Sequence, residues 1–153
     1  MIGVGAQAPD FELPDQHGAA VRLSALRGRP VVVVFFPFAF TGVCTGEMEA
    51  LRDDVVPAVG DSATVLAISC DSMFALRVFS TDRGLDFPLL SDFWPHGQVA
   101  SSYGVFDADR GCAVRATFVV DAAGVVRWTV THDLPDARNV ADYRRVLAEL
   151  SAA

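Results

Sequence analysis

The sequence predicts an α/β protein in which helices cover both faces of a mixed central β-sheet. Two continuous apolar runs rich in β-branched and aromatic residues, 30–36 and 63–70, are typical of strands buried on both faces. A helical pattern follows each run, at 42–58 and at 72–84. A strand–helix–strand order gives parallel strands joined by a right-handed crossover.

The remaining segments add antiparallel hairpins and two further helices. A Pro-Asp-Gln-His-Gly turn joins two short strands near the N-terminus, and Ala-Ala-Gly joins "AVRATFVVD" to "VVRWTVT". A short helical piece is expected at 97–103 and an amphipathic helix at 138–150. Because there is no repeat, low-complexity segment or linker, we expect a single domain over 1–153.

Composition argues against several classes of partner. The net charge is −7, and all 12 basic residues are arginine. An acidic surface repels phosphate backbones and anionic lipids, so we expect no nucleic-acid or membrane partner. The N-terminal stretch lacks a basic and an apolar region typical of export signals, and Pro37 interrupts the longest apolar run. We therefore expect a cytoplasmic protein.

The three cysteines, Cys44, Cys70 and Cys112, are widely spaced. They form no C-x-x-C motif and no Cys/His pair with metal-ligand spacing, so we expect no metal and no cofactor. In a reducing compartment these thiols should be free unless one of them is chemically reactive. Surface or structural roles are expected for the scattered histidines His17, His96 and His132.

Cys44 occupies an unusual electrostatic position. If Thr41 is the N-cap residue, Cys44 is at N3, on the inward face of the helix with Met48. A helix N-terminus stabilises an anion such as a thiolate by about 0.3–1 kcal/mol. Because burial opposes ionisation, a useful thiolate also needs a nearby cation, which the spacing alone does not identify. Glu47 has the wrong sign unless it is itself paired with an arginine.

Ordinary structural roles could also account for Cys44, for Thr41 and for two further residues, Pro37 and Arg115. A buried cysteine commonly acts as a small hydrophobic residue, and Thr41 would cap a helix in any protein. Pro37 could simply end a strand, and Arg115 within a strand would normally be a surface charge.

The stretch "PFAFTGVC" at 37–44 resembles the P-x-x-x-T/S-x-x-C signature of the peroxiredoxins, thiol peroxidases with a thioredoxin-like fold. The resemblance covers almost the whole chain and includes "APDFELPD", "AISCDS", "FPLLSD" and "YGVFDADRGCAVRATFVVD". The chain length and "SDFWPHG" are similar to the one-cysteine branch related to alkyl hydroperoxide reductase E of actinobacteria. The resemblance implies a thioredoxin-like fold with an N-terminal hairpin.

The same resemblance implies roles for five residues. Cys44 corresponds to the peroxidatic cysteine, which attacks the O–O bond and becomes a sulfenic acid. Thr41 corresponds to the hydroxyl that hydrogen-bonds the thiolate and the peroxide, and Pro37 to the proline that shields the site from water. Arg115 corresponds to the arginine that stabilises the thiolate and the transition-state charge. Glu47 matches a glutamate that orients this arginine.

No resolving cysteine is evident at the places the family uses; Glu49, for example, occupies one of them. Cys112 and Arg115 are three residues apart, so in one extended strand their side chains would face opposite sides. Cys70 ends its strand at the same sheet edge as Cys44, which makes it the better candidate. We nevertheless expect both to fill the core.

We therefore expect a one-cysteine thiol peroxidase acting on hydrogen peroxide, organic hydroperoxides or peroxynitrite. Its reductant would be a low-molecular-weight thiol or a thioredoxin-, glutaredoxin- or mycoredoxin-like protein. The alternative is a redox sensor or thiol relay that passes the oxidation of Cys44 to a partner without sustained turnover. The resemblance also implies a homodimer, for which the aromatic residues of "PFAF" and "FWPHG" are suited.

Overall fold

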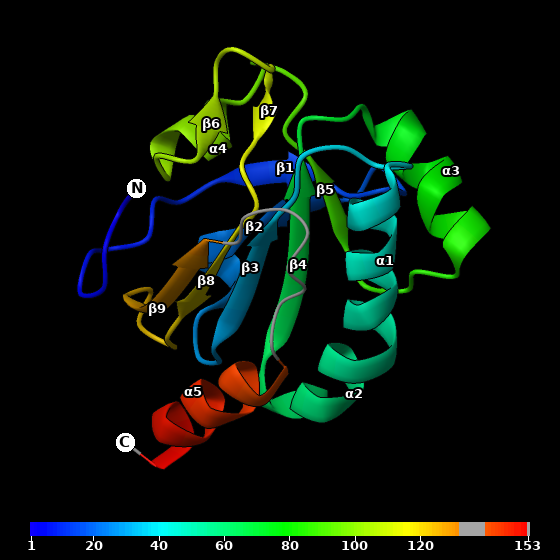
Figure 1. Ribbon diagram of the computed structural model, residues 1–153. Helices are drawn as coiled ribbons and strands as arrows, with labels where there is room; N and C mark the ends of the chain where they lie inside the picture. The colour runs from blue at the N-terminus through cyan, green and yellow to red at the C-terminus, as the bar shows by residue number, and fades with distance from the viewer. Residues whose placement is uncertain (132–139, 153) are drawn as a thin grey trace.

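The structure, a computed structural model, describes residues 1–131 and 140–152 (Figure 1). Its centre is a five-stranded sheet with strand order β5-β4-β3-β8-β9. β3 pairs in parallel with β4, and β4 with β5, whereas β8 runs antiparallel to both β3 and β9. The predicted mixed sheet is therefore confirmed. The strands span Val31–Phe35 (β3), Thr64–Ser69 (β4), Leu89–Ser91 (β5), Ala116–Val120 (β8) and Val126–Thr131 (β9).

The helices cover both faces of this sheet, as predicted. They are α1 (Gly42–Ala50), α2 (Val56–Val59), α3 (Met73–Arg83), α4 (Gln98–Ser102) and α5 (Val140–Ala152), with short 3-10 turns at Leu23–Leu26 and Gly60–Ser62. On one face, Val32 and Val34 of β3 belong to a core with residues of α1, α2, α3 and α5. On the other face, Val31 and Val33 pack with the N-terminal segment and α4. Successive side chains of β3 point to opposite faces of the sheet, so they contribute in turn to two different cores.

The helix expected over 42–58 is not uniform. A π-helical turn, Leu51–Val55, separates α1 from α2, and the N–H of Val56 bonds the carbonyl of Leu51, five residues earlier. Pro57 has no N–H to donate to the preceding turn, so the backbone pairing changes just before it. The closing helix begins at Val140, and the predicted positions 138–139, like His132, lie outside the described residues.

Two hairpins lie outside the central sheet. β1 (Glu12–Pro14) pairs with β2 (Ala20–Arg22), which confirms the N-terminal hairpin, and β6 (Phe106–Asp107) pairs with β7 (Cys112–Ala113). The strand expected over "AVRATFVVD" is interrupted at 114–115 because the chain changes partner there. Before the break it pairs with β6, and after it with β3.

One edge of the sheet gathers the chemically interesting residues. The parallel strands β3, β4 and β5 all end there, and six residues separate the end of β3 from the start of α1 (Figure 1). Because β8 is antiparallel, its first residue, Ala116, pairs with the last residue of β3, Phe35. Arg115 directly precedes Ala116, so it lies at the edge of the sheet where α1, the helix that carries Cys44, begins. No described helix is long and apolar enough to cross a membrane.

Candidate active site

Cys44 lies at the third position of α1 and is almost completely buried, with 1% of its surface exposed. Thr41 is the N-cap residue by position, with an extended backbone, as predicted. Its hydroxyl, however, accepts no hydrogen bond from the helix. It donates instead to the carbonyl of Phe38 at 2.9 Å. The Thr41 side chain thus closes the preceding turn, and the free N–H groups at the helix start remain available to stabilise negative charge.

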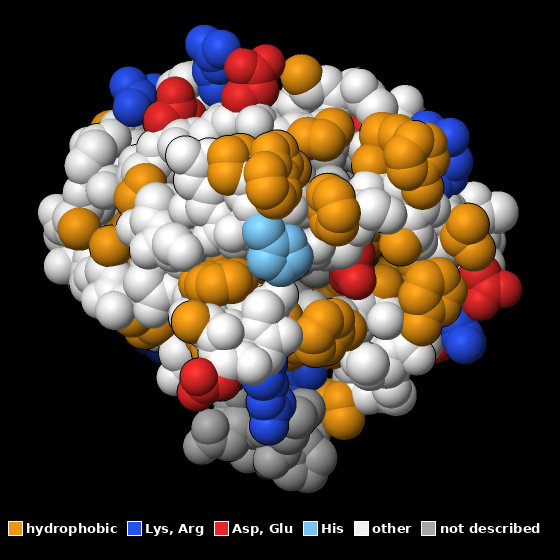
Figure 2. Space-filling model, turned by 90° about the horizontal axis from the view of Figure 1, so that it is seen from above, with side chains coloured by type: hydrophobic (Ala, Val, Ile, Leu, Met, Phe, Trp, Pro, Cys, Tyr) orange, Lys and Arg blue, Asp and Glu red, His pale blue; other side chains and the backbone are white. Residues whose placement is uncertain are grey.

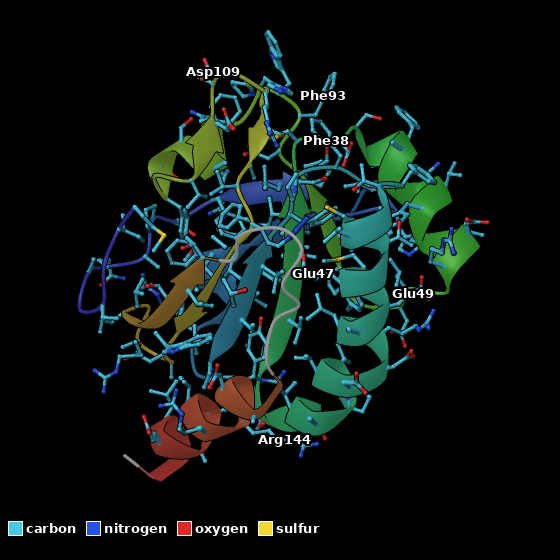
Figure 3. All side chains as sticks on the ribbon, viewed as in Figure 1. Phe38, Glu47, Glu49, Phe93, Asp109 and Arg144 are labelled. Carbon is cyan, nitrogen blue, oxygen red and sulfur yellow. The ribbon has the colours of Figure 1, made fainter. Side chains whose placement is uncertain are left out.

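Arg115 places a guanidinium beside the buried thiol of Cys44. Its Nη2 lies 3.1 Å from the Sγ of Cys44, and its Nε donates to Oε1 of Glu47 at 3.3 Å. All three side chains are buried; those of Arg115 and Glu47 are 3% and 4% exposed. Glu47 lies on the face of α1 that is turned toward the sheet, and Glu49 lies on the outer face (Figure 3). The ion pair fixes the guanidinium beside the sulfur.

Pro37 opens the turn that leads from β3 to α1. It is half-buried, whereas Phe38 and Phe40, further along the turn, are exposed. Phe40 adopts a left-handed φ of 70°, which is uncommon for any residue other than glycine. The turn therefore has a specific shape that local preferences do not favour.

The sequence did not identify Asp71, which contacts this turn. Its Oδ2 accepts a hydrogen bond from the backbone N–H of Ala39 at 2.9 Å. Asp71 follows β4 by two residues, and the carboxyl ends of parallel strands commonly carry site residues. That rule was the available signal, although spacing alone cannot show which backbone group the carboxylate contacts.

Cys70 and Cys112 are both buried free thiols. Burial raises the pKa of Cys70 to about 12, with a further contribution from the negative charge of Asp92. Burial also raises the pKa of Cys112 above its usual value. Thiols with raised pKa values stay protonated at neutral pH and are poor nucleophiles. The expected opposite orientation of Cys112 and Arg115 assumed one continuous strand, and that assumption is wrong because the strand is interrupted between them.

Other candidate chemistry is limited in the part of the chain that the structure describes. Among these residues no three His, Cys, Asp or Glu side chains are grouped so that they could hold a metal ion. His96 is exposed, and its two ring nitrogens lie 3.1 Å and 2.7 Å from the carbonyl oxygens of Phe93 and Gly111. These contacts connect two loops, and neither is made to Cys44 or Arg115.

Comparison with known proteins identifies the class to which this fold and site belong. A family model described as the AhpC/TSA family matches residues 4–129. Alkyl hydroperoxide reductase E of Mycobacterium tuberculosis is 44% identical over 153 residues, which cover 99% of this chain and 100% of the relative. Peroxiredoxin-2 of Bos taurus is 36% identical, covering 94% of this chain and 76% of the relative.

Among solved structures, the crystal structure of peroxidoxin BcpB from Mycobacterium tuberculosis superposes with a TM-score of 0.84. It is 34% identical, and the match covers 99% of this chain and 98% of that one. The chain belongs to the AhpC/TSA family and is a peroxiredoxin, a thiol peroxidase with a thioredoxin-like fold. Within that family it is of the alkyl hydroperoxide reductase E type.

Proposed function

We propose that Cys44 is the peroxidatic cysteine and that it reduces hydrogen peroxide, organic hydroperoxides or peroxynitrite. The observation that carries this proposal is the contact of 3.1 Å between Arg115 Nη2 and Cys44 Sγ in a buried site. A guanidinium stays protonated at all relevant pH values, so this contact favours the thiolate, the reactive form of the cysteine.

In the oxidation step, the thiolate attacks one peroxide oxygen. An S–O bond forms while the O–O bond breaks, and the departing oxygen takes up a proton to give water or an alcohol, or leaves as nitrite from peroxynitrite. The sulfur loses two electrons, which the peroxide gains. Negative charge moves from sulfur to the departing oxygen, and Arg115 is placed to stabilise it throughout.

Thr41, Pro37 and Glu47 support this step. The Thr41 hydroxyl donates to Phe38 O and keeps lone pairs that can accept the O–H of a hydroperoxide. Pro37, half-buried at the start of the turn, limits the access of water. Glu47 holds Arg115 through its Nε, which leaves Nη2 directed at the sulfur.

Regeneration is proposed to use an external thiol, following a one-cysteine mechanism. The sulfenic acid condenses with this thiol to give a mixed disulfide and water, and a second thiol then releases Cys44. The raised pKa values of Cys70 and Cys112 make them poor internal substitutes. A low-molecular-weight thiol or a thioredoxin-, glutaredoxin- or mycoredoxin-like protein of the cytoplasm would serve as reductant.

Sustained turnover tests this proposal. We expect the wild-type protein to consume many equivalents of hydrogen peroxide when dithiothreitol is present, and one equivalent when it is absent. Peroxide consumption followed over time measures both numbers. Consumption that stops after one equivalent despite excess dithiothreitol would favour the alternative, a redox sensor that passes its oxidation to a protein partner.

The proposal also includes a homodimer formed through the apolar residues that surround the site. Large hydrophobic side chains at this end of the molecule are exposed, and Figure 2 shows orange side chains gathered on this face. We call these residues the apolar rim: Phe38, Phe40, Val43, Phe74, Val78, Phe93 and Trp94. Exposed apolar groups of this number are typical of an interface with another protein.

We expect the protein to sediment as a dimer at micromolar concentration, at twice the mass of the 16.3 kDa chain. Phe74→Asp, which places a charge in the apolar rim, should shift the protein toward monomer. Val4→Asp is the matched control, because Val4 is equally exposed, at 66% against 67% for Phe74, but lies outside the rim. A wild-type protein that sediments only as a monomer would contradict the dimer.

A further inference from the structure

The turn 37–41 is held in place by a carboxylate from another strand. Oδ2 of Asp71 accepts the backbone N–H of Ala39 at 2.9 Å and the hydroxyl of Ser69 at 2.7 Å. Ala39 is buried, with 7% of its surface exposed, so its N–H has little access to water and needs a protein partner. Asp71 provides that partner.

Asp71 is itself anchored at the edge of the sheet. The buried hydroxyl of Ser91, the last residue of β5, donates to the backbone carbonyl of Asp71 at 2.6 Å. Ser69, the last residue of β4, is fully buried and orients the carboxylate. The ends of two strands therefore fix one side chain, which in turn contacts the turn that follows β3.

The turn needs such support because its backbone is strained. Phe40 has a φ of 70°, and its ring packs against that of Phe79 at 5.1 Å between centroids. Beyond it, the Thr41 hydroxyl donates to Phe38 O, and the carbonyl of Thr41 accepts the N–H of Thr45 at 2.8 Å. Contacts therefore lead from Asp71 to Ala39, and from the adjoining Phe38 through Thr41 to the first turn of α1.

We propose that Asp71 is a positioning residue for peroxide reduction, which holds the turn 37–41 so that the Thr41 hydroxyl meets the peroxide at Cys44 in a reactive geometry. This inference rests on the proposed role of Cys44 and extends it to a residue that contacts neither the sulfur nor Arg115. Misplacement of a reacting group by about 1 Å can lower a rate about 100-fold. Loss of the Ala39 contact is therefore expected to be visible in the rate of oxidation.

An electrostatic role for Asp71 is the competing explanation. Its negative charge contributes to the raised pKa values of Cys70 and Cys112, so the carboxylate does act on nearby thiols. Asp71→Asn separates the two explanations because the amide keeps an acceptor oxygen for Ala39 but carries no charge. Positioning predicts that Asp71→Asn recovers most of the rate lost in Asp71→Ala.

The test compares two reactions of Cys44 in the reduced protein under single-turnover conditions. One is oxidation by hydrogen peroxide, which requires the arranged site, and the other is alkylation by iodoacetamide, which reports the reactive thiolate. We expect Asp71→Ala to slow oxidation by about 10- to 100-fold while alkylation changes by less than about threefold. Equal losses in both reactions, or no loss in either, would overturn the proposal.

Asp121→Ala is the matched control. Asp121 likewise accepts backbone N–H groups in a turn, from Ala123 and Val125, but at the other end of β8 from Arg115. It should lower thermal stability in the same way without slowing oxidation. Should Asp71→Ala fail to fold, Ser69→Ala provides a milder variant, and the same selective loss of oxidation is expected.

A double variant tests the route of the effect. If Asp71 acts through the turn that carries Thr41, adding Asp71→Ala to Thr41→Ala should slow oxidation by less than about threefold. A full additional loss would overturn the proposal. Absence of oxidation in the wild-type protein would refute the function of Cys44 instead, so the two failures are distinguishable.

Discussion

Replacement of Cys44 by serine is expected to abolish peroxide consumption in the presence of dithiothreitol. The serine hydroxyl is not ionised beside Arg115 and forms no analogue of a sulfenic acid. Without the sulfur, the site has no group that donates two electrons to the peroxide and takes up one of its oxygens. Hydrogen peroxide consumption should fall to the rate of dithiothreitol alone. The thermal unfolding midpoint of Cys44→Ser shows whether the fold is retained.

The two remaining cysteines serve as controls for this variant. Cys70→Ala and Cys112→Ala each remove a buried thiol that has a raised pKa. Both should retain turnover, with a loss of stability from the small cavity that each creates. Retention of full turnover in Cys44→Ser would refute the assignment of the peroxidatic cysteine.

Replacement of Arg115 by glutamine is expected to lower the second-order rate of Cys44 oxidation by about 100- to 1,000-fold, the usual cost of losing one well-placed charge-stabilising donor. The variant loses the Nη2 contact with the sulfur at 3.1 Å. It also removes the guanidinium from the buried Glu47, which should cost about 3–5 kcal/mol of stability. Stopped-flow measurement of oxidation and chemical denaturation check the two effects.

The double variant Arg115→Gln/Glu47→Gln separates the effect on the oxidation rate from the effect on stability. With both charges removed, no buried ion remains uncompensated, so stability should recover in part. The oxidation rate should stay low, because the sulfur still lacks its cation. Recovery of the rate together with stability would show that Arg115 acts on the fold and not on the reaction.

Several features of this structure could be predicted from the sequence because they depend on local patterns. The apolar run of β3 and the helical spacing after it place Cys44 at the start of α1, on the inward face. The β1–β2 and β8–β9 hairpins are marked by their turn residues, whereas the β6–β7 hairpin was not predicted. Ser72 and Gly84, a capping residue and a left-handed glycine, bound α3 as their types predict.

The features that could not be predicted depend on contacts between distant segments. β5 has only three residues, and its pairing with β4 decides that it is a strand. The sequence alone favours Arg115 as a surface charge, and only the family resemblance placed it in the site. The change of partner from β6 to β3, which accompanies its burial, was not anticipated. The contact between Asp71 and Ala39 joins residues 32 positions apart. Thr41 closes its own turn because Phe40 adopts a rare backbone conformation.

The most direct test of the account is the intact mass of the reduced protein after one equivalent of hydrogen peroxide in the presence of dimedone. It is measured for the wild type and for the double variant Cys70→Ala/Cys112→Ala. We predict one dimedone adduct, located on Cys44, in both proteins. A wild-type protein that instead loses the mass of two hydrogens, while the double variant forms the adduct, would show an internal disulfide and contradict the one-cysteine mechanism.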